Sequence, residues 1–63
     1  IVGKVTCSGT SSTVTGFTAE LNGAPVVVSM DANIATTGAV IAAGTLTIHH
    51  ASSTDDATYA IFA

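Results

Sequence analysis

The chain contains a single cysteine, Cys7, so it cannot form an internal disulfide. It has only 63 residues, and a domain of this size buries only about 60% of the surface that its unfolded chain exposes. Domains below about 70–80 residues usually need disulfides, a metal or partner chains to supplement one small core. We therefore expect a domain that is marginal by itself, is completed by partner chains, or belongs to a longer chain.

The chain is apolar and almost uncharged, with 48% hydrophobic and 8% charged residues. This balance excludes the charge-rich disordered class. One lysine, no arginine and a net charge of −3 argue against binding to nucleic acid or anionic membranes, because both require clustered cations. The longest apolar run, residues 39–43, is far shorter than the ~20 residues of a membrane-spanning helix. Because so few charges protect poorly against aggregation, we expect an assembly to cover much of the surface.

Short runs of β-branched residues with alternating apolar positions are typical of strands, and no window has the apolar spacing of a helix. We expect strands at residues 1–8, 14–21, 26–30, 39–42, 45–50 and 57–62. Asn22-Gly23 predicts a two-residue hairpin turn between the second and third of these. The sequence therefore predicts an all-β chain of five to six short antiparallel strands, arranged as a sandwich or small barrel. The residues expected in its core are Cys7, Phe17, Ala19, Leu21, Leu46, Ile48, Tyr59 and Ile61.

The last twenty residues, from Gly44 to the end, contain Leu-x-Ile, a turn, and then Asp-x-Ala-x-Tyr. This pattern resembles the E and F strands of an immunoglobulin-like domain of the intermediate or variable type. The resemblance implies that Asp55 is a structural turn residue and that Tyr59 forms the tyrosine corner. It also places Ile61 where the family has its second cysteine.

The first half of the chain extends this resemblance. Residues 4–9 (KVTCSG) look like strand B with Cys7 as the first cysteine, and residues 17–26 (FTAELNGAPV) look like the C–C′ hairpin. The tryptophan of the family would fall at Ala19 or Phe17, but the chain has none. The resemblance implies one antiparallel sandwich domain over residues 1–63 that lacks strands A and G, either incomplete or part of a longer chain.

A second resemblance concerns residues 5–31 and 36–44, whose turn-rich pattern is similar to PAAR-type spike-tip proteins. That family binds zinc through three histidines and one cysteine. This chain offers Cys7, His49 and His50, and Met30-Asp31 replaces the Gly-Asp of the family.

Few residues point to chemistry. His49 and His50 are adjacent, so on a strand they face opposite sides; we expect one exposed and one partly buried beside a hydroxyl, rather than a shared metal. Asp55 and Asp56 lie in a turn, where a carboxylate usually binds backbone N–H groups. Cys7 is expected to be a small buried hydrophobe. The serines and glycines match no nucleophile elbow or phosphate loop, so the sequence predicts no catalytic, cofactor or metal site.

These features predict a non-enzymatic structural or interaction module, most simply a component of a phage or other particle or of an extracellular surface assembly. Two alternatives stay open: a zinc-bound spike tip and an adhesion or receptor domain of the immunoglobulin class. The expected partner is protein, through self-association or docking on a larger assembly, without nucleic acid or membrane insertion. Residues 26–28 and 57–62 carry few charges that would protect an exposed sheet edge, so we expect pairing there.

Overall fold

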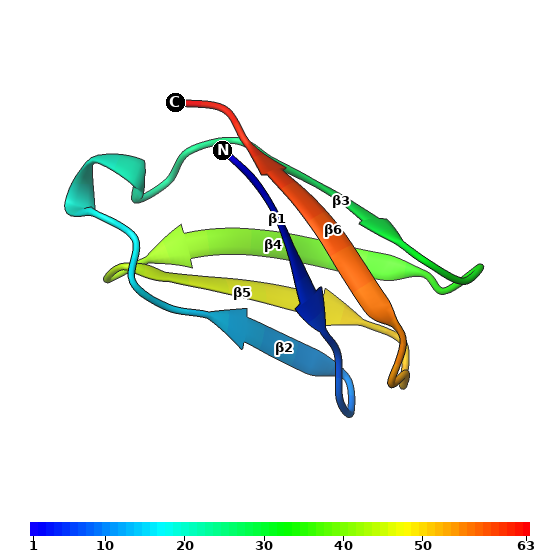
Figure 1. Ribbon diagram of the computed structural model, residues 1–63. Coiled ribbons are helices and arrows are strands. Elements are labelled where there is room, and N and C mark those ends of the chain that lie inside the picture. Colours follow the sequence, from blue (N-terminus) through cyan, green and yellow to red (C-terminus); the bar gives the residue numbers. More distant parts are fainter.

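The computed structural model describes all residues 1–63 and contains six strands and one short 3₁₀ turn (Figure 1). Their bounds are β1 (Val2–Thr6), β2 (Ser11–Val14), η1 (Ala19–Leu21), β3 (Val26–Met30), β4 (Thr36–Ala42), β5 (Thr45–His50) and β6 (Asp56–Ile61). The strands form two antiparallel three-stranded sheets, in the orders β1-β6-β3 and β2-β5-β4. The prediction of a small antiparallel all-β sandwich is confirmed.

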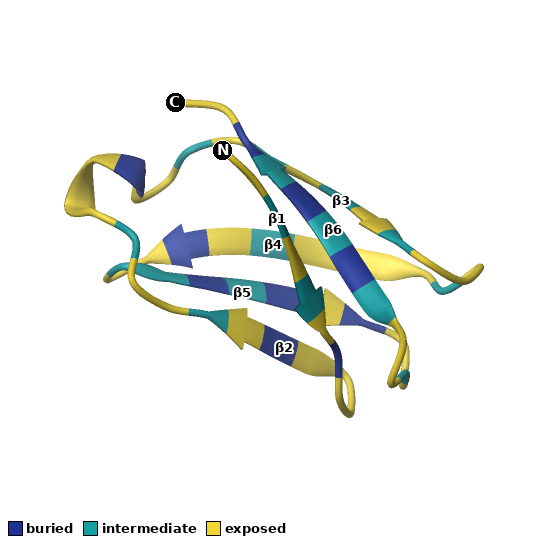
Figure 2. Cartoon of the chain, viewed as in Figure 1, coloured by how far each residue is buried: buried dark blue, intermediate teal, exposed yellow.

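The two sheets stack face to face, with β1 in contact with β2 and β3 in contact with β4 (Figure 1). The central strands β5 and β6 alternate buried and less buried residues along their length, and their buried side chains form the middle of the core (Figure 2). Leu46 and Ile48 are fully buried. The whole core comprises Cys7, Leu21, Ile41, Leu46, Ile48, Ala57, Tyr59 and Ile61. Phe17 is half-buried and packs edge-on against Tyr59, with 6.2 Å between ring centroids.

The expected strand over residues 14–21 is wrong. Strand β2 ends at Val14, and Gly16 then adopts a φ of 95°, which favours glycine and turns the chain. Residues 19–21 form the 3₁₀ turn η1, which buries only Leu21. Ala19, which the alternation placed in the core, is exposed, because a 3₁₀ turn does not keep the two-residue period of a strand.

Asn22-Gly23 is a turn but not a hairpin. Asn22 has φ −59° and ψ 126° and Gly23 has φ 76°, a type II turn closed by a 3.0 Å hydrogen bond from Ala24 N–H to Leu21 O. Tertiary contacts hold it: Gly23 N–H donates to Ile41 O at 2.8 Å. The Asn22 side-chain oxygen also accepts a hydrogen bond from Gly44 N–H at 3.2 Å. The turn therefore packs against the end of β4 and the turn that leads into β5, instead of joining two paired strands.

The two-residue hairpin of the chain is Ala43-Gly44, between β4 and β5. Both residues have positive φ, 52° and 75°, as a type I′ turn requires. Ala43 is the only non-glycine residue with positive φ, and an alanine resists this conformation more than asparagine does.

This strained alanine gives a stability prediction. We expect Ala43→Asn to raise the free energy of unfolding by about 0.5–1 kcal/mol, because Asn-Gly is the preferred type I′ pair. Urea denaturation followed by circular dichroism measures the change. Ala42→Asn, one residue earlier in the strand, is the control and should not stabilise; an equal gain at both positions would contradict the explanation.

The position of β1 differs from that expected for an immunoglobulin strand B. In that family strands B and F lie in opposite sheets, whereas β1 pairs directly with β6, with Val5 opposite Ala57. The assignment of residues 4–9 to strand B is therefore wrong.

A tyrosine corner is defined by a hydrogen bond from the tyrosine hydroxyl to the backbone. The Tyr59 hydroxyl makes none of the side-chain hydrogen bonds of the structure. Its ring lies over Gly3 on the neighbouring strand instead.

Candidate functional site

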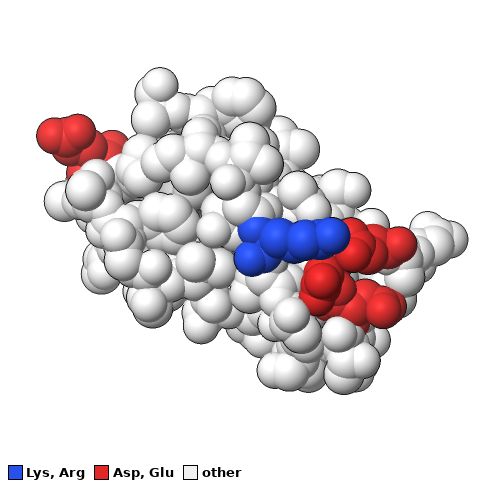
Figure 3. Space-filling model, in the orientation of Figure 1, with Lys and Arg blue, Asp and Glu red and all other residues white.

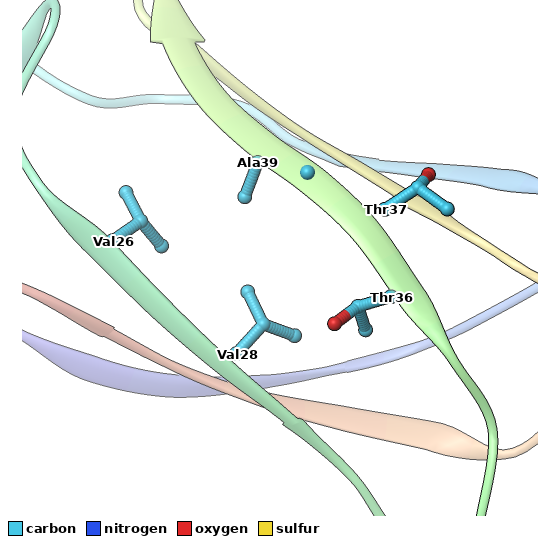
Figure 4. Close-up of a pocket in the computed structure, with 6 residues that line it drawn as sticks. Val26, Val28, Thr36, Thr37 and Ala39 are labelled. Carbon is cyan, nitrogen blue, oxygen red and sulfur yellow. The ribbon is translucent and has the colours of Figure 1, made fainter.

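An open groove separates β3 and β4 along one side of the sandwich. It has a volume of about 260 Å³ and is lined by Val26 and Val28 of β3 and by residues 36–39 of β4. Val26 and Val28 point toward Ala39 and Thr36 across it (Figure 4). All the lining residues are uncharged, so the groove suits an uncharged occupant.

The sequence of β4 explains why the sheets leave space here. The β4–β5 register shifts between Thr36 and Gly38, which marks a β-bulge, and bulges bend a strand away from regular packing. Ala39, which points across the groove toward β3 (Figure 4), also contributes only a methyl group. The valine side chains are consequently only half-buried.

The outer edge of β3 has free backbone groups. Antiparallel strands exchange hydrogen bonds at every second residue, and the 3.0 Å bond from Phe62 N–H to Pro25 O shows that odd-numbered residues of this segment face β6. The N–H and C=O groups of Val26, Val28 and Met30 therefore point away from the sheet. Such a row of unpaired groups is a template for another strand.

The other three edge strands are protected. Strand β1 carries Lys4 near its middle, and β2 has only four residues. Strand β4 has its bulge at one end, and at the other Gly23 N–H occupies the outward carbonyl of Ile41. Charge, shortness and bulges are the usual means of blocking edge pairing. Strand β3 has none of them; only Pro25 precedes it.

Acidic side chains lie toward the two ends of the visible face, and the single lysine, Lys4, extends from the middle of that face to the larger acidic cluster (Figure 3). At one end Lys4 forms a 3.2 Å ion pair with Asp31, the residue after β3. Asp31 N–H also donates to Asp56 O, and Asp55 precedes that residue in sequence. Glu20, in η1, is the remaining acidic residue.

The residues considered for metal or acid-base chemistry are not brought together. No group of three His, Cys, Asp or Glu side chains converges in the structure. Cys7 is buried in the core, His49 is exposed, and His50 is buried on the opposite face of β5. The sequence predicts one exposed histidine and one partly buried beside a hydroxyl; His49 is exposed, and His50 lies beside the Ser12 hydroxyl but is more deeply buried than predicted. Asp55 is exposed in the turn before β6, and its N–H donates to Ser53 Oγ at 3.0 Å.

His50 belongs to a buried hydrogen-bond network with Ser12. The distance from Ser12 Oγ to His50 Nε2 is 2.8 Å, and that from His50 Nδ1 to the carbonyl of Ala51 is 2.7 Å. Only a protonated nitrogen can face a carbonyl, so in the neutral ring Nδ1 donates to Ala51 and Nε2 accepts from the serine. Ser12 Oγ also accepts a hydrogen bond from Ser8 N–H at 3.2 Å. The pair thus links the start of β2 to the end of β5.

The sequence identified one part of the unprotected sheet edge and misplaced another. Residues 26–28 do lie on an unprotected edge strand. Residues 57–62, also expected to form an exposed edge, belong mainly to β6, which is paired on both sides. Met30 and the β4 residues that line the groove were not among the predicted site residues. The uncharged run VVVSM, residues 26–30, is the sequence feature that could have predicted Met30 as part of this edge.

Neither the protein-family models nor the curated proteins nor the solved structures include a match to this chain. No helix here has the length and apolar character needed to cross a membrane.

Proposed function

We propose that this chain is a non-enzymatic structural module that joins protein chains by accepting a β-strand along the edge of β3, within a larger particle or surface assembly. The observation that carries the proposal is the unprotected edge of β3 beside an uncharged groove. Main-chain hydrogen bonds supply affinity in this mode of recognition, and pockets for alternate side chains supply specificity. The groove is placed to receive such side chains.

The proposal includes an immunoglobulin-like topology. In that family one sheet has the order A-B-E-D and the other C-F-G. Strands β2 to β6, taken as B to F in chain order, give the neighbours B-E-D and C-F. Strand β1 then lies beside F, in the place of G. This assignment, which replaces that of residues 4–9 as strand B, is supported by strand order alone and makes β3 the edge strand C.

A proline scan tests the proposed function. Val28→Pro removes one outward N–H without removing a hydrogen bond to β6, because Val28 does not face that strand. Thr13→Pro removes an outward N–H from the edge of β2 and is the matched control. The probe is a fluorescent, extended peptide of alternating valine and threonine, and fluorescence anisotropy measures its binding.

We expect the unaltered chain and Thr13→Pro to bind the peptide similarly, and Val28→Pro to bind at least about tenfold more weakly, which corresponds to about 1.4 kcal/mol. Far-UV circular dichroism confirms that each variant keeps its strands. Equal binding by both proline variants, or no binding by the unaltered chain, would count against strand acceptance at β3.

A further inference from the structure

We infer that the strand accepted by β3 is the β3 of a second copy of this chain, paired antiparallel about a twofold axis at Val28. This inference rests on the proposed function and specifies its partner. The pairing would join two three-stranded sheets into one of six strands, in the order β1-β6-β3 followed by the partner copy's β3-β6-β1.

The backbone hydrogen-bonding groups of β3 are complementary to themselves. With Val28 opposite Val28 of the partner copy, Val26 falls opposite Met30 and Met30 opposite Val26. These are the three residues whose N–H and C=O groups point outward from β6. In an antiparallel pair such residues exchange both hydrogen bonds. Every outward group of β3 is satisfied in this register, whereas a shift by one residue would oppose them to groups already bonded to β6.

In this pairing the groove-facing sides of the two β3 strands also lie next to each other. Directly opposed residues of an antiparallel pair place their side chains on the same face of the sheet, about 4.5–5.5 Å apart at Cβ. The Val28 side chains of the two copies therefore lie next to each other on the side that faces the groove (Figure 4). The two grooves become one continuous uncharged space across the axis, and the half-buried valines of each copy are covered by the other.

The charge distribution favours a copy of the chain in this orientation. Asp31 follows β3 directly, and its N–H donates to Asp56 O. With Asp55 and Asp56 it gives this end three carboxylates against the one cation Lys4, so the end stays negatively charged despite the Lys4–Asp31 ion pair. Antiparallel pairing places that end beside the uncharged Pro25 of the partner copy. The acidic ends are thus separated to opposite sides of the dimer, despite a net charge of −3 on each chain. Parallel pairing would instead bring them together.

Two double variants test the register. On the outer face, Val27 falls opposite Ser29 of the partner copy, and both side chains are exposed to solvent. Val27→Lys with Ser29→Lys places two lysine pairs in direct opposition across the axis, which disfavours pairing. Val27→Lys with Ser29→Glu, the matched control, places lysine opposite glutamate twice. Sedimentation equilibrium measures the dimer dissociation constant, and circular dichroism verifies the fold.

We expect the unaltered chain to reach twice its single-chain mass of 6.2 kDa, and the Lys/Lys variant to dissociate at least about tenfold more readily than the Lys/Glu variant. A single-chain mass at all concentrations, or equal dissociation constants for the two variants, would overturn the twofold pairing. Particles that grow without limit would also overturn it, because a twofold interface closes. If the valine-threonine peptide still binds in those cases, strand acceptance stands and the partner is a different chain.

Discussion

Replacing Gly3 by alanine is expected to lower the free energy of unfolding by about 1–3 kcal/mol, the usual range for an overpacked core site. Gly3 lies opposite Tyr59 in the β1–β6 pair. A methyl group at this position would collide with the hydroxyl and the outer ring carbons of Tyr59. The ring cannot easily move away, because Tyr59 is only 7% exposed and also packs against the Phe17 ring.

The effect should be large for so small a domain. A core of this size supplies roughly 3–5 kcal/mol, and each kcal/mol shifts the melting temperature of a 60–100-residue domain by about 4–8 °C. Thermal unfolding followed by circular dichroism gives the measurement. Gly38→Ala is the matched control, since an added methyl there meets nothing within 4 Å and its φ is not positive. A loss of stability at Gly38 as large as at Gly3 would show that glycine flexibility, not the tyrosine contact, matters.

The central strands were predictable from sequence because their environment is symmetrical. Strands β5 and β6 are each paired on both sides, and their buried side chains belong to the same core cluster. Their buried residues therefore follow the two-residue period without interruption, as in Leu46 and Ile48 or Tyr59 and Ile61. Local alternation contains this information, so the predicted positions in β5 agree with the structure.

The segment between β2 and β3 could not be predicted in the same way. Phe17, Ala19 and Leu21 alternate as a strand would, but the conformation is set by contacts distant in sequence. The N–H of Gly23 donates a hydrogen bond to the carbonyl of Ile41, and the N–H of Phe17 donates one to the carbonyl of Gly44 at 3.1 Å. These tertiary bonds outweigh the local strand preference, as often happens with β-propensity. The same contacts prevent Asn22-Gly23 from forming the hairpin that its composition favours.

The proposed docking edge, β3, could be predicted from the sequence only in part, for a related reason. Low charge marks both β3 and β6, but sequence does not say which of them is an outer strand. That distinction depends on strand order, which is set by pairings between distant segments such as β1 with β6. The protective features of the competing edges, a bulge in β4 and the Gly23–Ile41 bond, also exist only in three dimensions.

Ser12→Ala is expected to lower the free energy of unfolding by about 1–3 kcal/mol, because it leaves buried polar groups without partners. The serine hydroxyl donates a hydrogen bond to His50 Nε2 and accepts one from Ser8 N–H. Removing it orphans the histidine nitrogen, and His50 is only 3% exposed, so water cannot easily replace the bond. Urea denaturation of Ser12→Ala provides the measurement.

A double-mutant cycle separates this hydrogen bond from packing. His50→Leu removes the polar ring. In the Ser12→Ala/His50→Leu double variant, neither the serine hydroxyl nor the histidine nitrogen is left buried without its hydrogen-bond partner. We therefore expect the double variant to be less destabilised than the sum of the two single variants, with a coupling of about 1–2 kcal/mol. Ser11→Ala, at the exposed neighbour of Ser12 in the same strand, is the control and should change stability by less than about 0.5 kcal/mol. Additive single effects would mean that Ser12 and His50 contribute through packing alone. A measured coupling would instead show that this buried pair holds β2 to β5 and so stabilises the sheet that faces β3.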